Sequence, residues 1–158
     1  MPHTAFEQNS EILRSLAKGY ILRNGAANGE PSAAELARGR GYKIPNGALF
    51  TTVSDLAHFV SLEMGDGPEA VLSKAVLADN LTRVNSAEGD LSFGYGTGFM
   101  KYRDGNLVVN GHGGSVAGYV AGAYFNPESH IGIIFLRNAA GRGFRNAVVM
   151  KSLAALVK

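Results

Sequence analysis

The sequence predicts an α+β fold, with helices in the first half, an antiparallel β-sheet in the second half and a helix at the C-terminus. Apolar residues recur at helical spacing in "TTVSDLAHFVSLEMG" and again in "FRNAVVMKSLAALVK". Between these stretches the pattern changes to short apolar runs separated by turn residues, from "GFMKYRDG" to "HIGIIFLRN". Strands that follow one another so closely predict a meander of about four strands, with helices packed on it.

The length and composition fit one globular domain that covers residues 1–158. The chain has 158 residues, of which 46% are hydrophobic and 18% are charged. Glycine is unusually common, with 21 residues. Many glycines fall in "GYGTGF" and "GHGGSVAGY", where they mark tight backbone sites and not a flexible linker.

The composition excludes or disfavours several functional classes. The 15 basic residues are dispersed among 13 acidic ones, so we expect no nucleic-acid partner. There is no cysteine, which excludes disulfides, thiolate nucleophiles and cysteine-based zinc sites. The four histidines lack metal-ligand spacing, so we expect neither a metal nor a cofactor. No apolar run is long enough to predict a membrane span, and residues 1–10 lack the pattern of a signal peptide.

The first half of the chain predicts helices joined by a long loop. A short helix begins near Glu11 and is expected to end at Gly19. Residues 24–42, rich in glycine, alanine and asparagine, predict a loop with at most one helical turn. A second helix follows, with Thr51 or Thr52 as its N-cap and Gly65 as its stop. A third is expected to begin at Pro68, a residue suited to the first helical position.

The second half predicts the sheet. Asp104 and Gly105 separate two short strands and predict a hairpin. A strand over 118–125 comes next, followed by a turn at "NPES". The apolar run over 130–138 predicts a central, buried strand. A helix over 144–158 closes the chain.

The segment His112-Gly113-Gly114-Ser115 allows more than one interpretation. It can be a glycine-rich turn that leaves a polar histidine at the edge of a strand. It can also belong to an α/β-hydrolase, because "HGGS" is similar to an oxyanion loop and the serine is nearly in a nucleophile elbow. That elbow requires a helix after the serine, whereas a strand-like run follows here.

A third interpretation comes from a family resemblance. The segments "IPNGALFTTVSDLAHFVSLEMG", "FGYGTGF", "GHGGSVAGY" and "IGIIFLRN" resemble, in this order, the C-terminal half of penicillin-recognising serine hydrolases. This family includes class C β-lactamases, related esterases and D-Ala-D-Ala peptidases. The resemblance covers almost the whole chain. It implies the C-terminal part of the β-lactamase/transpeptidase-like fold.

The resemblance also implies roles for individual residues. His112 stands where the lactamases have the lysine of their third motif, beside the catalytic site. Gly113 and Gly114 would allow a substrate to lie against the strand edge. The backbone N–H of Ser115 would be one of two oxyanion-hole donors, each worth about 3 kcal/mol of transition-state stabilisation. Tyr95 would line the site, although the simpler interpretation is an aromatic that packs over a glycine turn.

The family's nucleophilic Ser-x-x-Lys motif and its Tyr-x-Asn motif are not found where the resemblance requires them. "MPHTAFE" resembles the segment that follows these motifs, so we expect the chain to be a C-terminal half. Ser15-Leu-Ala-Lys18 fits Ser-x-x-Lys, but it occupies an ordinary segment of the family, and Gly19 is expected to leave Lys18 solvated. Tyr124-Phe-Asn126 fits Tyr-x-Asn, yet it lies at the end of a strand.

Two functional hypotheses follow from different classes. In the first, the chain belongs to a serine hydrolase that cleaves a small-molecule ester, amide or β-lactam through an acyl-enzyme. In the second, it is a catalytically silent module that pairs with itself or with a complementary chain. Because the parent fold packs its sheet with both halves of the chain, we expect exposed apolar faces and a homo-oligomer.

Overall fold

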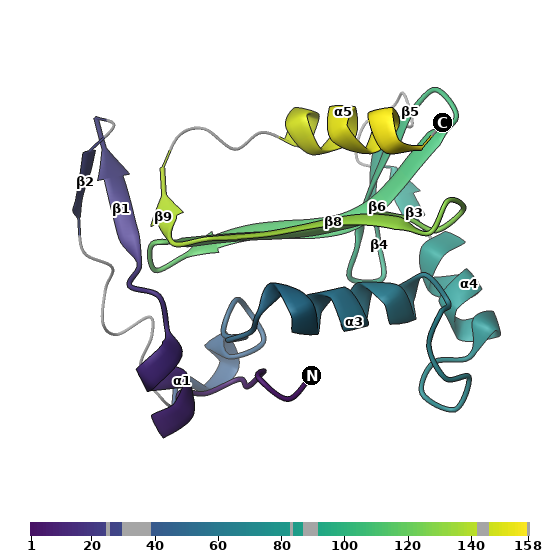
Figure 1. Ribbon diagram of the computed structural model, residues 1–158. Coiled ribbons are helices and arrows are strands. Elements are labelled where there is room, and N and C mark those ends of the chain that lie inside the picture. The colour runs from purple at the N-terminus through teal and green to yellow at the C-terminus, as the bar shows by residue number, and fades with distance from the viewer. Residues whose placement is uncertain (25, 30–38, 83, 87–91, 142–145, 158) are drawn as a thin grey trace. The chain divides into compact units, whose positions relative to one another are not determined.

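A computed structural model describes residues 1–24, 26–29, 39–82, 84–86, 92–141 and 146–157 (Figure 1). Helices precede a run of consecutive strands, and a helix ends the chain, so the α+β prediction is confirmed. The described chain divides into two compact units. One comprises Met1–Leu56, Gly113–Ala121 and Phe135–Gly143, and the other comprises Ala57–His112, Gly122–Ile134 and Phe144–Lys158. The single domain predicted from the chain length stays a prediction.

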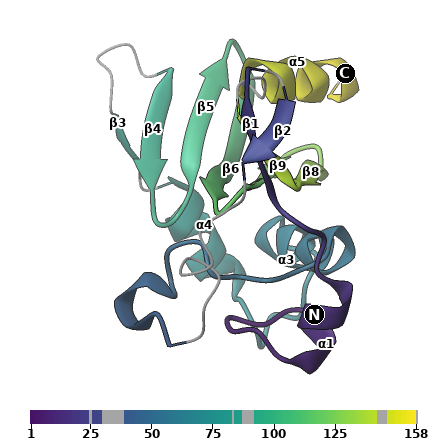
Figure 2. The ribbon, with the colours of Figure 1, turned by 90° about the vertical axis from the view of Figure 1, so that its left-hand side faces the viewer.

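The larger sheet has six strands, and its spatial order follows the sequence (Figure 2). The four strands of the expected meander are β5 to β8, and β3 and β4 extend the sheet on one side. The strands are β3 (Val84–Ser86), β4 (Phe93–Gly96), β5 (Met100–Asp104), β6 (Leu107–Val116), β7 (Tyr119–Asn126) and β8 (Ile131–Arg137).

The turns of the meander are built by local chemistry that the sequence carries. Gly105 adopts a positive φ of 59° in the two-residue turn between β5 and β6, with Asp104 opposite Leu107. In the turn before β8, Asn126 Oδ1 accepts a hydrogen bond of 2.8 Å from Ser129 N. Both turns predicted from the sequence are therefore confirmed.

The apolar strand β8 lies at the edge of the sheet and is not central. None of its seven residues is fully buried, and Leu136 is 39% exposed. The prediction of a central, buried strand over 130–138 is therefore wrong. Its apolar run indicates a surface suited to burial, but it does not specify on which side a neighbouring strand lies.

Helix α3 (Val53–Glu63) confirms the helix predicted in this region. Thr52 Oγ1 accepts a hydrogen bond of 3.1 Å from Asp55 N, so Thr52 is the N-cap residue. Beyond the helix end, Gly65 has a positive φ of 90°, as the predicted stop requires.

Asp55 connects the start of α3 to the N-terminal segment. Its carboxylate accepts hydrogen bonds from His3 N at 2.8 Å and from Thr4 Oγ1 at 2.6 Å. Burial would raise the pKa of Asp55. The hydrogen bonds from Thr4 and His3 and the nearby positive charge outweigh burial, so the pKa is lowered.

The other two predicted helices differ at their ends. Helix α4 (Lys74–Thr82) begins after Ser73, whose hydroxyl accepts from Val76 N at 3.3 Å, and not at Pro68. The carbonyl of Pro68 accepts from Val71 N, so the proline opens a separate turn. Helix α1 (Ser10–Ser15) has Asn9 as its N-cap and ends at Ser15, before the expected Gly19.

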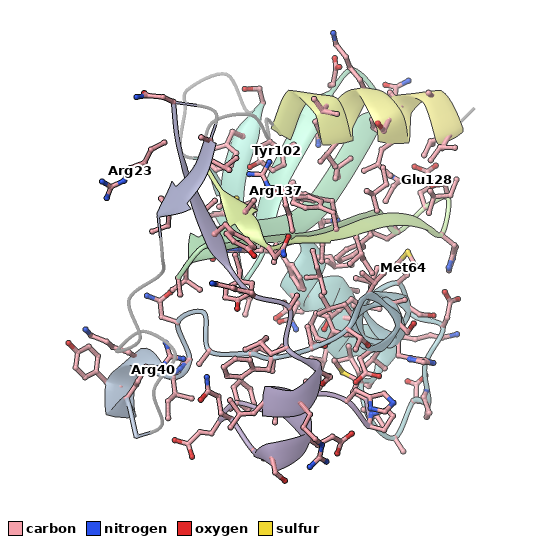
Figure 3. All side chains as sticks on the ribbon, turned by 60° about the vertical axis from the view of Figure 1, so that its left-hand side comes forward. Arg23, Arg40, Met64, Tyr102, Glu128 and Arg137 are labelled. Atoms are coloured by element: carbon pink, nitrogen blue, oxygen red, sulfur yellow. The ribbon has the colours of Figure 1, made fainter. Side chains whose placement is uncertain are left out.

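A second, three-stranded sheet lies within the first unit, in the order β2-β1-β9. Strand β1 (Tyr20–Arg23) pairs with β2 (Ala26–Gly29) and, in parallel, with β9 (Ala139–Ala140). The described part of the predicted loop over 24–42 therefore contains a strand, β2, and a short 3₁₀ turn, η1 (Gly41–Lys43). Arg23 ends β1 and points away from it (Figure 3).

In the second unit, the part of α3 from Ala57 onward and α5 (Asn146–Leu156) lie on opposite faces of the strand segments that belong to this unit (Figures 1 and 2). Val60 of α3 approaches β8 so closely that a Cβ on Gly132 would lie 3.0 Å from its Cγ1. Val149 and Leu153 are the buried residues of α5, which confirms the predicted C-terminal helix. The Phe99 ring contacts both the Phe59 ring and the fully buried Phe125 ring.

Candidate functional site

The candidate site is the second half of β6, which extends past the end of β5. The two strands are paired from Asp104 with Leu107 to Met100 with Gly111. Met100 is the first residue of β5, so His112–Val116 has no β5 residue opposite it. A strand edge that is left open on one side presents its backbone groups to a ligand.

His112 and Tyr95 were predicted from separate sequence segments, and the structure brings them together. Their ring centroids lie 5.8 Å apart, and the ring planes meet at 87°, which is an edge-to-face contact. His112 is exposed on β6, and Tyr95, on β4, is 41% exposed. The two rings are therefore packed against each other and remain open to solvent.

The glycines and the serine after His112 leave the strand uncovered. Gly114 and Ser115 are exposed, and Gly113 is half-buried. A Cβ placed on Gly114 would have no described atom within 4 Å, apart from its neighbours in the chain. The backbone here is therefore accessible to a bulky group, as the prediction for Gly113 and Gly114 requires.

The turn that follows β6 explains Gly118, the last glycine of "GHGGSVAGY". Ala117 and Gly118 both have positive φ, 50° and 81°, in the tight turn between β6 and β7. A Cβ on Gly118 would lie 2.8 Å from Tyr20 N, so the turn packs directly on the start of β1. Tyr119 Oη also donates a hydrogen bond of 2.7 Å to the carbonyl of Ala17.

The "PNGA" segment supports the same end of β6, a role that the sequence analysis missed. Gly47 has a positive φ of 79°, and a Cβ there would lie 3.4 Å from Cγ1 of Val116. Ala48 beside it is 3% exposed. The Pro-Asn-Gly sequence signals a turn, but it does not reveal which strand the turn will contact.

Ser15 and Lys18, the Ser-x-x-Lys match, do not share a helix. Helix α1 ends at Ser15, and the Ser15 hydroxyl donates to the Glu11 carbonyl at 3.0 Å. The Lys18 ammonium lies 5.7 Å from the centroid of the Tyr20 ring. Both side chains are exposed, which does not provide the desolvation by which a lysine becomes a base.

The Tyr-x-Asn match belongs to the core. Tyr124 is 2% exposed, and burial, with Tyr102 nearby, raises its pKa to about 12. Asn126 is 3% exposed, and its Nδ2 donates to the Val108 carbonyl at 2.7 Å. These contacts give both residues structural roles in the sheet.

The buried Glu63 and the half-buried Lys101, both in the second unit, also have shifted pKa values. Glu63, at the end of α3, is 9% exposed, and burial raises its pKa. Its Oε2 has no hydrogen-bond partner among the described residues. Burial, with Arg103 nearby, lowers the pKa of Lys101, whose Nζ donates to the Leu81 carbonyl near the end of α4.

The described part of the chain contains no group of three or more His, Cys, Asp or Glu side chains that could hold a metal ion. Nor does it contain a helix of the length and hydrophobicity needed to cross a membrane.

Comparison with known proteins decides the family. A sequence model described as "Beta-lactamase" matches residues 1–155, which is nearly the whole chain. This chain belongs to the β-lactamase family. The resemblance to penicillin-recognising serine hydrolases read from "FGYGTGF" and "GHGGSVAGY" is therefore confirmed.

A solved structure gives the same answer for the fold of this β-lactamase-family chain. This chain is similar to the solved structure of the octameric penicillin-binding protein homologue from Pyrococcus abyssi, with a TM-score of 0.69 and 23% sequence identity. The match covers 99% of this chain and 34% of that one, so the chain spans about a third of the length of the homologue. A comparison with curated proteins found no match.

Proposed function

We propose that this chain carries the oxyanion-binding strand of a serine hydrolase that cleaves an ester, an amide or a β-lactam through an acyl-enzyme. The observation that carries the proposal is the part of β6 that extends beyond β5 and exposes His112, Gly114 and Ser115. Membership of the β-lactamase family supplies the reaction class.

The alternation of the strand supports Ser115 as a backbone donor. In an antiparallel pair, every second residue directs its N–H and C=O to the same neighbouring strand. The two-residue turn makes Leu107 a residue that faces β5, because Asp104 is its partner. Every second residue of β6 after Leu107 therefore faces the side on which β5 lies. Gly113 and Ser115 face this side, beyond the point where β5 ends. An N–H in that position can donate to the oxyanion of a tetrahedral intermediate.

The proposal gives His112 a role beside the reacting carbonyl. An exposed imidazole can donate a hydrogen bond to a substrate carboxylate or polarise a hydrogen-bond network. Ser15 is not the nucleophile in this proposal, because its hydroxyl donates into its own helix and Lys18 lies beyond the helix end. The acylated serine would come from a Ser-x-x-Lys segment of the kind the family uses.

The proposal is tested by incubating the folded chain with a fluorophosphonate serine probe and measuring its intact mass, followed by peptide mapping. We expect no adduct on Ser15 or Ser115. A stoichiometric adduct on Ser15 would contradict its exclusion, and one on Ser115 would favour the nucleophile-elbow interpretation over the oxyanion role.

A matched experiment examines the strand directly. The chain is assayed for hydrolysis of a chromogenic β-lactam and of a p-nitrophenyl ester in the presence of a Ser-x-x-Lys-containing partner segment from the family. We expect His112→Gln and Gly114→Val to reduce the rate, whereas Val148→Thr on the exposed face of α5 leaves it unchanged. A rate unaffected by either β6 variant would rule out the proposed site.

The alternative is a catalytically silent module that self-associates, and one observation favours it. Strand β8 is an apolar edge strand whose first six residues, Ile131–Leu136, carry no charge and no proline. Natural edge strands usually carry a charged residue or a proline, because an edge without them can pair with another chain. The octameric state of the Pyrococcus abyssi homologue supports self-association of this fold. Sedimentation at low micromolar concentration tests it, and a clean monomer would contradict it.

A further inference from the structure

The imidazole of His112 receives little support from its own strand. Gly111 precedes it, and Gly113 and Gly114 follow it, so within two residues of His112 along the strand only Asn110, which is buried, carries a side chain. The Cβ position of Gly114 is open, and His112 itself is exposed. An exposed side chain on such a strand exchanges among its staggered rotamers. A catalytic or binding imidazole needs one orientation, and another element must provide it.

Tyr95 is placed to provide that orientation. Strands β4 and β6 flank β5, and the pairings of Tyr95 with Met100 and of Met100 with Gly111 set Tyr95 level with the residue before His112. The ring contact of 5.8 Å at 87° lies within the range preferred by aromatic pairs. All of these residues belong to the second unit.

We propose that Tyr95 is a positioning residue that fixes the imidazole of His112 through the contact between their rings. The ring of Tyr95, and not its hydroxyl, orients the imidazole, because an edge-to-face contact requires only the aromatic face or edge. The functional consequence rests on the proposed role of His112, whereas the positioning itself does not. Contacts of this kind bias a conformational population by about two- to tenfold.

The first test is a nuclear magnetic resonance measurement on the full chain. The sequence has four histidines, so a ¹H–¹³C spectrum of the imidazole Cε1–H groups contains four signals, and His112→Gln identifies one of them. We expect a nuclear Overhauser effect between the Tyr95 ring protons and the His112 ring protons. We also expect Tyr95→Leu to remove the ring-current shift of the His112 signal and Tyr95→Phe to retain it.

Tyr42→Leu is the matched control, because Tyr42 is 87% exposed and lies in the other unit. It should leave the His112 signal where it is. A wild-type spectrum with no Overhauser effect between the two rings would overturn the proposal, and this result does not depend on any variant folding. A natively folded Tyr95→Leu variant with an unchanged His112 signal would also overturn it.

Kinetics separates this inference from the proposed function. In an active hydrolase preparation, we expect Tyr95→Leu to lower kcat about two- to tenfold with KM unchanged, and Tyr95→Phe to restore it. If Tyr95→Leu shifts the His112 signal but hydrolysis is insensitive to His112→Gln, the positioning stands and the proposed function fails. If hydrolysis depends on His112 and the His112 signal does not respond to Tyr95→Leu, the proposed function stands and the positioning role of Tyr95 fails.

Discussion

At the scale of single residues, Glu63 is a buried carboxyl that stability measurements can probe. It lies at the C-terminal end of α3, where the helix dipole disfavours negative charge, and its Oε2 has no hydrogen-bond partner among the described residues. Burial raises its pKa from the ordinary value of 4.5. An unsatisfied buried charge destabilises the folded state, so the folded protein releases the Glu63 proton at a higher pH than the unfolded chain does.

We expect Glu63→Gln to raise the free energy of unfolding at pH 7 by about 1 kcal/mol, the lower end of the cost of an unsatisfied buried group, because water still screens part of the charge. The folded pKa is higher than the unfolded one, so wild-type stability falls as the pH rises from 4.5 through the folded pKa. Urea unfolding at pH 4 and pH 7 measures both effects. A difference between the proteins that is as large at pH 4 as at pH 7 would contradict this account.

The individual site residues were predictable to different degrees. His112, Gly113, Gly114 and Ser115 form one continuous segment, so a local motif was enough to find them. The contact between Tyr95 and His112 could not be predicted, because it depends on the register of two hairpins and no single segment contains both residues. Asp55 lies inside the predicted helix, and no local pattern indicates that it binds the N-terminal segment.

At the scale of elements, the turn between β6 and β7 is a tight contact point that substitution can test. We expect Gly118→Ala to lower the free energy of unfolding by about 2–3 kcal/mol, because an alanine at positive φ is strained and its Cβ would lie 2.8 Å from Tyr20 N. Thermal and urea unfolding of the variant measures the loss.

The neighbouring position provides the control. Ala117 already has a positive φ of 50°, so Ala117→Gly relieves strain while it makes the unfolded chain more flexible. These effects nearly offset each other, and we expect a change of less than about 1 kcal/mol. Equal losses in both variants would show that the turn does not depend on the backbone conformation of Gly118.

The elements themselves were predicted where the signal is local. The α3 cap at Thr52, the stop at Gly65 and the β5–β6 turn all depend on residues within one turn of each other. Strand β1 was missed because its local partner, β2, has the alanine, asparagine and glycine composition of a loop, and its other partner, β9, lies far along the sequence. For α4, two local start signals competed, and the Ser73 hydroxyl forms the cap while Pro68 opens a turn of its own.

At the scale of the whole molecule, the apolar edge strand β8 is the surface expected to carry the proposed self-association. We expect Leu136→Lys to weaken self-association at least about tenfold, because a charge on an edge strand opposes pairing with another chain. Leu136 is 39% exposed, so the fold should tolerate the change. Analytical ultracentrifugation over a concentration series measures the dissociation constant.

Val148→Lys on α5 is the matched control, because Val148 is also apolar and is 53% exposed but belongs to a helix and not to the edge strand. It should not change the dissociation constant. If both lysine variants weaken association equally, general charge repulsion and not the β8 edge governs it. If neither does, β8 is not the interface.

The parallel pairing of β1 with β9 has a consequence for the order in which the chain folds. The strands β5 to β8 follow one another through short turns, so their contacts close small loops and can form early. Tyr20 instead pairs with Ala139, which is synthesised much later. During synthesis from the N-terminus, β1 therefore emerges long before its parallel partner exists. We expect the small sheet to be the last part to form, and its early strands to rely on chaperones or on each other until then.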